Sequence, residues 1–135
     1  MISASHNPYP YNGIKIFGES GYKLSDELEE QIESIVLDNT PPCRPAAADQ
    51  LGRYEDASFA LHDYVLYLSH TTAISLEGMR LVIDCANGSA STTAKELFEG
   101  LGAECSLLSC TPDGININAA CGSTDMAALR EESRE

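Results

Sequence analysis

The chain has 135 residues, of which 43% are hydrophobic, so it is long enough for one ordinary domain or two incomplete ones. Eight basic and 21 acidic residues give a formal net charge of −13, which argues against nucleic acid or an anionic membrane as a partner, since both are bound through clustered Lys and Arg. No apolar run approaches the roughly 20 residues of a membrane span. No secretion signal follows Met1 either, so we expect a cytoplasmic protein.

The first part of the chain opens with a turn-rich stretch. Pro8 and Pro10 exclude a regular helix, and Asn12-Gly13 is a dipeptide typical of tight turns. Residues 14–17 predict a short strand, with Ile14 and Ile16 on one face and Lys15 on the other.

Two helices are predicted next. Ser25 is a good N-cap for a helix over residues 26–38, which has apolar side chains at helical spacing. Residues 41–53 are rich in Pro and Ala and predict a loop. Residues 57–70 predict a second helix whose apolar stripe indicates core packing.

The second part of the chain predicts a βαβ unit. Residues 80–84 read as a buried strand and residues 104–108 as another. Between them lies a helix that Ser89 or Ser91 can cap and Gly102 ends. A strand, a helix and a strand in this order predict that the two strands are parallel.

A turn at Asp113-Gly114 and a final helix within residues 125–134 complete the predicted elements. We therefore expect an α/β fold made of two incomplete α/β domains, residues 1–74 and residues 75–135.

The five cysteines predict free thiols, because their number is odd and no pair has the Cys-x-x-Cys spacing of a zinc or redox site. They lie at positions 43, 85, 105, 110 and 121.

The stretch Ser-Ala-Ser-His-Asn-Pro, residues 3–8, is the most informative part of the sequence. Ser5, in a loop beside an imidazole, can accept a phosphoryl group if the loop holds its hydroxyl outward. A phosphoserine carries about −1.5 to −2 charges and needs cations, amide donors or Mg²⁺ nearby. Taken alone, a Ser-His pair in a loop is more often structural, because adjacent side chains do not face each other as a catalytic dyad must.

Several motifs in the same order resemble those of the α-D-phosphohexomutase family, and the later ones are most similar to its bacterial phosphoglucosamine mutase branch. The matching stretches are residues 3–8, 11–15, 21–24, 82–88, 112–118 and 121–124. The resemblance covers nearly the whole chain, with residues 40–75 the least distinctive.

The resemblance implies roles for three residues. Ser5 would be the serine that is phosphorylated, and one oxygen of its phosphate would be a ligand of Mg²⁺. His6 would support the loop and the reacting phosphate. Lys15 matches the family's lysine near the reaction centre and would serve in acid/base or electrostatic catalysis, which as a base requires a lowered pKa. The alternative for Lys15 is a solvated lysine on a strand.

Two later stretches receive no catalytic role. The strand, glycine turn and helix around residues 84–91 could bind phosphate at the helix N-terminus, but the glycine spacing matches neither a P-loop nor a dinucleotide fingerprint. We interpret this turn as structural. Residues 113–124 are diagnostic of the family, and no chemistry follows from them.

The resemblance also implies missing parts. The family's Asp-Gly-Asp-x-Asp metal loop, its sugar-recognition loop and its distal phosphate site have no counterpart here. The beginning of the first domain has none either, so Met1 is expected to be an internal position of a full-length relative. Split domains would leave sheet edges and apolar faces uncovered, which predicts marginal stability.

The expected function is that of a fragment of an isomerase, a phosphosugar mutase that interconverts the 6- and 1-phosphates of a hexosamine through a bisphosphorylated intermediate. Glucosamine phosphate is the favoured substrate. A phosphoglucomutase or phosphomannomutase of the same family is the alternative. Two further alternatives are a truncated chain without catalytic activity and a stand-alone sugar-phosphate or protein-binding module. The oligomeric state stays open.

Overall fold

A computed structural model describes residues 1–42 and 44–134. Its contacts divide the chain into two compact units. The first unit consists of Met1 and residues Ile14–Asp56, and the second of Ile2–Gly13 together with the chain from Ala57 onward. These units are groups of contacting residues, and the domain boundary between residues 74 and 75 stays a prediction.

The first unit is built around one helix, α1 (Asp26–Asp38), whose bounds are those that the sequence predicts. The Ser25 carbonyl accepts hydrogen bonds from the amides of Leu28 and Glu29, while the Ser25 hydroxyl makes no capping hydrogen bond. Asn39 ends the helix in the left-handed conformation. The loop that follows contains a short 3₁₀ helix, η2 (Ala48–Gln50).

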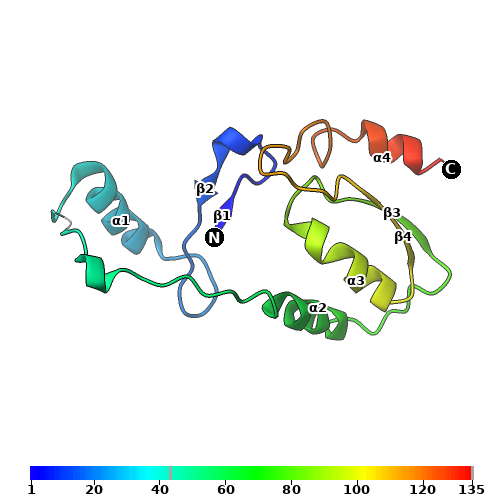
Figure 1. Ribbon diagram of the computed structural model, residues 1–135, viewed down its shortest axis with the longest axis horizontal. Coiled ribbons are helices and arrows are strands. Elements are labelled where there is room, and N and C mark those ends of the chain that lie inside the picture. The colour runs from blue at the N-terminus through cyan, green and yellow to red at the C-terminus, as the bar shows by residue number, and fades with distance from the viewer. Residues whose placement is uncertain (43, 135) are drawn as a thin grey trace. The chain divides into compact units, whose positions relative to one another are not determined.

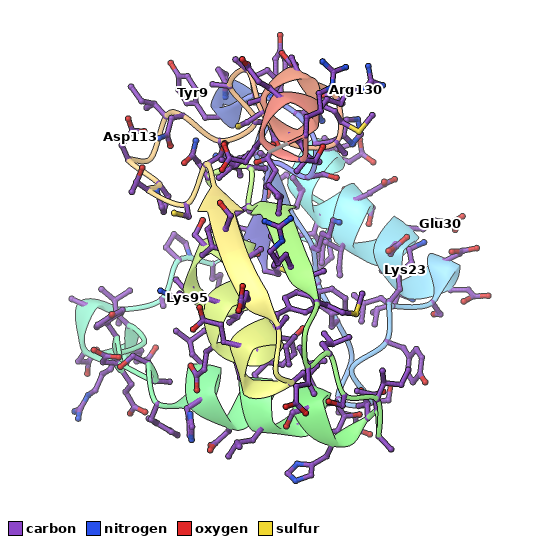
Figure 2. All side chains as sticks on the ribbon, turned by 90° about the vertical axis from the view of Figure 1, so that its right-hand side faces the viewer. Tyr9, Lys23, Glu30, Lys95, Asp113 and Arg130 are labelled. Carbon is purple, nitrogen blue, oxygen red and sulfur yellow. The ribbon has the colours of Figure 1, made fainter. Side chains whose placement is uncertain are left out.

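The second unit contains the predicted βαβ arrangement (Figure 1). Strands β3 (Arg80–Asp84) and β4 (Glu104–Leu108) are parallel and pair in register, from Arg80 opposite Glu104 to Asp84 opposite Leu108. Helix α3 (Ala94–Gly100) connects them and packs on β4. Figure 2 looks onto this two-stranded sheet, with α3 behind it. Both strands and their parallel pairing confirm the prediction.

The start of α3 differs from the prediction. A 3₁₀ helix, η3 (Ser89–Thr92), precedes it, and the N-cap is Thr93 rather than Ser89 or Ser91. The capping prediction was wrong because the chain makes a tighter turn before it becomes α-helical. The hydroxyl oxygen of Ser91 is buried and has no hydrogen-bond partner among the described residues.

The predicted helix end is confirmed at Gly102. This glycine has a φ of +100°, and a Cβ added there would lie 3.1 Å from the backbone nitrogen of Glu77. A glycine therefore lets the chain leave α3 close to Glu77, which lies in the loop before β3.

Two further helices pack on the βαβ unit. Helix α2 (Ala60–His70) lies beside α3 (Figure 1), and it begins three residues later than predicted because residues 57–60 form a turn. A contact of 2.6 Å between His62 Nδ1 and Glu96 Oε1 joins the two helices. Helix α4 (Ala127–Glu132) lies against β3 and is shorter than the predicted range.

The N-terminal segment forms short elements only. Strands β1 (Ile2–Ser3) and β2 (Gly13–Ile14) make a two-stranded sheet, and between them lies a 3₁₀ helix, η1 (Tyr9–Tyr11). Only Ile14 of the predicted strand over residues 14–17 is in β2, because β1 offers a partner of just two residues. Phe17 instead forms an isolated antiparallel bridge with Lys23.

The described core is small. Strand β3 is half-buried rather than buried as predicted, because the described sheet has two strands and α3 covers one of its faces. The buried hydrophobic residues are Ala4, Val65, Cys85, Ala94, Ala103 and Cys121. Large apolar side chains such as Ile2, Ile14 and Tyr54 are exposed. No helix among the described residues is long and apolar enough to cross a membrane.

Candidate functional site

Ser5 lies in an exposed loop of defined shape, residues 4–8, which we call the serine loop. Its φ is 55°, in the left-handed region that non-glycine residues rarely adopt. The Ser5 amide donates to Ser3 Oγ at 3.0 Å, and the Asn7 amide closes the turn on the Ala4 carbonyl at 3.0 Å. Ala4 is 1% exposed, so the loop is anchored on its N-terminal side while Ser5 projects outward.

The hydroxyl of Ser5 faces the neighbouring imidazole, although adjacent side chains were not expected to face each other; the left-handed backbone at Ser5 turns the two together. Ser5 Oγ lies 3.4 Å from His6 Nδ1, at the long end of hydrogen-bonding distance. Both side chains are exposed. The pair can therefore orient a hydroxyl, or a group attached to it, while leaving its other side open to a reacting molecule. The structure thus brings together two of the three predicted site residues.

Asn118 holds the serine loop from a distant part of the chain. Its side-chain amide donates to the carbonyl of Ser5 at 3.0 Å and to the carbonyl of Asn7 at 2.8 Å. The backbone amide of Asn118 donates to the Ala86 carbonyl at 2.9 Å. Asn118 therefore connects the serine loop to the end of β3.

Asp84 holds in place two residues next to Asn118, namely Ala86 and Gly122. One carboxylate oxygen accepts from the Ala86 amide at 2.8 Å, and the other accepts from the Gly122 amide at 2.7 Å. Gly122 has a φ of +78°, and a Cβ there would lie 2.8 Å from the Ala86 Cβ and 3.1 Å from Asn118 Oδ1. Only glycine fits this approach. We call Asp84, Ala86, Asn118 and Gly122 the Asp84–Asn118 network.

Asn87 ties the same two loops together a second time. The side-chain nitrogen Nδ2 of Asn87 donates to the Asn116 carbonyl at 3.3 Å, and Oδ1 of Asn87 accepts from the Thr111 backbone amide at 3.2 Å. Asp113 then closes its own turn by accepting from the amides of Ile115 and Asn116. Asp113 is labelled in Figure 2 on this loop, beyond the carboxyl ends of the strands.

Left-handed residues concentrate here. Of the seven described non-glycine residues with positive φ, six lie in the serine loop or in the loops after β3 and β4. They are Ser5, Ala86, Asn87, Ser109, Asn118 and Ala120. Each such conformation costs on the order of 1–3 kcal/mol and persists where surrounding contacts enforce it. The hydrogen bonds of the Asp84–Asn118 network are contacts of that kind.

The cysteines of this region are free, as predicted, and the same holds for every described cysteine; Cys43 lies outside the described residues. Cys85 and Cys121 are each 2% exposed. Burial raises the pKa of the Cys85 thiol, and the nearby Cys110 and Asp84 raise it further. Cys85 is therefore a structural thiol rather than a nucleophile.

Lys15 belongs to the first unit. Its backbone pairs with Met1 in both directions, each hydrogen bond at 2.8 Å. It lines a groove of about 530 Å³ together with Ile32 and Lys23. Lys23, labelled in Figure 2, lies 2.9 Å from Glu29, which raises the pKa of the lysine. Lys15 is thus an exposed cation in a groove of mixed charge.

The described residues contain no group of three or more His, Cys, Asp or Glu that could hold a metal ion. Reasoning from the sequence also missed Asn118 as the partner of the serine loop and Asp84 as the residue that supports the surroundings of Asn118. The signal that could have found them was present, since both belong to stretches that matched the family motifs without a role being assigned.

Comparisons with known proteins show which sequences this chain is similar to. Residues 1–42 match the family model described as phosphoglucomutase/phosphomannomutase, alpha/beta/alpha domain I. Phosphoglucosamine mutase of Caldicellulosiruptor saccharolyticus is 50% identical over 137 residues, covering 98% of this chain and 30% of that protein. Phosphoglucosamine mutase of Acetivibrio thermocellus is 46% identical over 131 residues, covering 97% and 29%.

A third relative, phosphoglucosamine mutase of Moorella thermoacetica, is 50% identical over 135 residues, covering 98% of this chain and 30% of that protein. The chain therefore spans about 30% of the length of the curated relatives that it matches. Because the match covers 98% of the chain, the similarity extends through both compact units. With its α/β fold, the chain belongs to the phosphohexomutase family.

Proposed function

We propose that this chain carries the phosphoserine loop of a phosphosugar mutase that interconverts glucosamine 6-phosphate and glucosamine 1-phosphate. The observation that supports this most is the exposed Ser5 hydroxyl, which lies beside His6 on a residue whose backbone is in the left-handed conformation. The substrate rests on the printed names of the relatives, which are phosphoglucosamine mutases at 46–50% identity.

The proposed reaction moves one phosphoryl group out and another back. Phosphorylated Ser5 transfers its phosphoryl group to the free hydroxyl of the sugar phosphate, so the bond from phosphorus to Ser5 Oγ breaks and a bond to the sugar oxygen forms. The sugar hydroxyl gives its proton to a base, for which Lys15 is the candidate, and Ser5 Oγ gains a proton as it leaves. The bisphosphate then returns its other phosphoryl group to Ser5 Oγ, whose proton passes to the released sugar oxygen. His6, 3.4 Å from that oxygen, supports the phosphate.

Magnesium fits this chain only in part. The phosphate on Ser5 offers an oxygen ligand of the kind that Mg²⁺ prefers, and the ion would neutralise charge on the transferring group. Among residues 1–42 and 44–134, however, no acidic cluster could complete its coordination. We therefore propose that Ser5 is this chain's ligand and that other ligands belong to parts of the mutase outside it.

A phosphoglucomutase or phosphomannomutase is the second candidate, favoured by the description of the family model that matches residues 1–42. We also propose residues 1–74 and 75–135 as parts of two successive mutase domains. A cytoplasmic location and the exclusion of nucleic acid as a partner stay predictions, and the second rests on the net charge of −13.

The deciding experiment is the intact mass of the purified chain before and after incubation with Mg²⁺ and glucosamine 1,6-bisphosphate. We expect the gain of one phosphate in the unsubstituted chain and none in Ser5→Ala. Parallel incubation with glucose 1,6-bisphosphate distinguishes the two candidate substrates. Phosphate uptake by Ser5→Ala at the normal rate would refute the assignment of Ser5, and no uptake by either chain would identify a chain that is inactive by itself.

A further inference from the structure

The serine loop has a conformation that its own residues do not explain. Ser5 adopts a φ of 55° although it is not glycine, and within the loop the Asn7 amide makes one turn-closing hydrogen bond. Such backbone conformations persist where the surrounding structure enforces them. The contacts that enforce this one come from outside the loop.

Ser3 Oγ accepts from the Ser5 amide at 3.0 Å, and Asn118 supplies two further contacts with matched chemistry. A side-chain amide has two N–H donors, and here they meet two carbonyl oxygens, of Ser5 at 3.0 Å and of Asn7 at 2.8 Å. The opposite orientation of the amide would place its oxygen against both carbonyls, so the hydrogen bonds themselves fix which atom faces the loop. The two carbonyls belong to the residues before and after His6, so one side chain restrains the backbone on both sides of His6.

Asn118 is in turn held rigidly. It is left-handed itself, with a φ of 56°, and its amide is bonded to the Ala86 carbonyl. The Asp84 carboxylate accepts hydrogen bonds from the amides of Ala86 and Gly122 and so holds both of these neighbours of Asn118. A positioning group needs this kind of support, because a loose donor would not hold a reacting oxygen in place.

We propose that Asn118 is a positioning residue for phosphoryl transfer at Ser5. It holds the Ser5 hydroxyl in its outward orientation through the two backbone carbonyls and touches neither the phosphate nor the sugar. This role rests on the proposed function of Ser5, whereas the restraint of the loop by Asn118 is measurable without any phosphoryl transfer.

Two substitutions test the restraint. Asn118→Gly removes the side-chain amide and still allows the left-handed backbone, whereas Asn118→Asp keeps the shape and places an anionic oxygen against the two carbonyls. The matched control is Asn39→Gly, which also replaces a left-handed asparagine but lies at the end of α1. All three are made in the 135-residue chain.

The first readout is amide hydrogen exchange followed by NMR. We expect the Asn7 amide to exchange about tenfold faster in Asn118→Gly, and faster again in Asn118→Asp. The amides of α3 should keep their protection in both variants, and Asn39→Gly should leave Asn7 unchanged. Unchanged exchange at Asn7 in either Asn118 variant, with α3 intact, would overturn the proposal.

The second readout is the rate at which Ser5 takes phosphate from glucosamine 1,6-bisphosphate. Asn118→Gly should lower the maximal rate about tenfold and leave the half-saturating concentration nearly unchanged, because Asn118 does not touch the sugar. An equal maximal rate in Asn118→Gly and Asn39→Gly would overturn the positioning role. If the unsubstituted chain takes no phosphate, the proposed activity of this chain fails, and the exchange measurement still decides whether Asn118 restrains the loop.

Discussion

The two compact units are stabilised in different ways. Among the described residues of the first unit we find local side-chain hydrogen bonds, such as Ser34 to the Gln31 carbonyl and Lys23 to Asp26, and no residue of α1 is buried. In the second unit, Asp84 bonds to Gly122 and Asn118 bonds to Ser5, across 38 and 113 positions of sequence. All six of the described buried hydrophobic residues lie in this second unit.

This difference identifies the part of the chain that specifies a site. The periodicity and the end residues of α1 are enough to specify this helix, and its printed hydrogen bonds hold no distant part of the chain in place. The second unit instead holds a strained loop at a defined place through long-range hydrogen bonds. Substitutions in the Asp84–Asn118 network should therefore have larger effects on folding stability than substitutions in α1.

The largest effect is expected for Asp84→Ala. This substitution leaves the partly buried amides of Ala86 and Gly122 without their acceptor and should lower the free energy of unfolding by about 3 kcal/mol. The matched control is Asp125→Ala, which removes an exposed carboxylate from the Ala127 amide and should cost about 1 kcal/mol. Urea denaturation followed by circular dichroism measures both, and equal losses would contradict the special position of Asp84.

A smaller loss of stability is expected when either of two glycines with positive φ is replaced by alanine, and comparing the two separates steric crowding from backbone strain. Gly122→Ala should destabilise by about 2–3 kcal/mol, because its methyl group would lie 2.8 Å from the Ala86 Cβ. Gly114→Ala has a φ of +95° with no atom within 4 Å of the new methyl group, so it should cost only about 1 kcal/mol. The difference between the two denaturation midpoints reports the close approach alone.

The smallest effect concerns pH and lies in the first unit. Glu29 and then Asp26 raise the pKa of Lys23 above its ordinary value of 10.5. Because the folded-state pKa is the higher one, this stabilisation is fully present below pH 10.5 and is lost as the pH rises through the raised value. Lys23→Met should remove that alkaline loss. Both groups are exposed, so we expect a small change in the melting of α1, screened further by salt.

Much of the local structure could be predicted from the sequence. The bounds of α1 and of both strands of the βαβ unit match because helical periodicity and short apolar runs between turn residues are local properties of the sequence. The first turn of α3 was missed, since serines at positions 89 and 91 suit a cap equally well and the 3₁₀ turn depends on packing. The α/β fold class is confirmed by the family.

The candidate site was predictable as a motif but not as a structure. Ser5 and His6 adjoin in sequence and meet in space. The contact of Asn118 with the serine loop spans 113 positions to Ser5 and has no local signature, so only tertiary structure shows it. The family motif around residues 113–124 indicated that something there was specific without indicating what it held.

The buried thiols of Cys85 and Cys121 have a practical consequence. Cys121 lies 3.9 Å from the side-chain nitrogen of Asn87, within the loops that support Asn118, and both sulfurs are shielded from solvent. Alkylation requires an exposed thiolate, so a reagent such as iodoacetamide can label these sulfurs only in molecules whose loops have opened. The rate at which Cys85 and Cys121 are labelled would thus measure how often the loops that support the serine loop open.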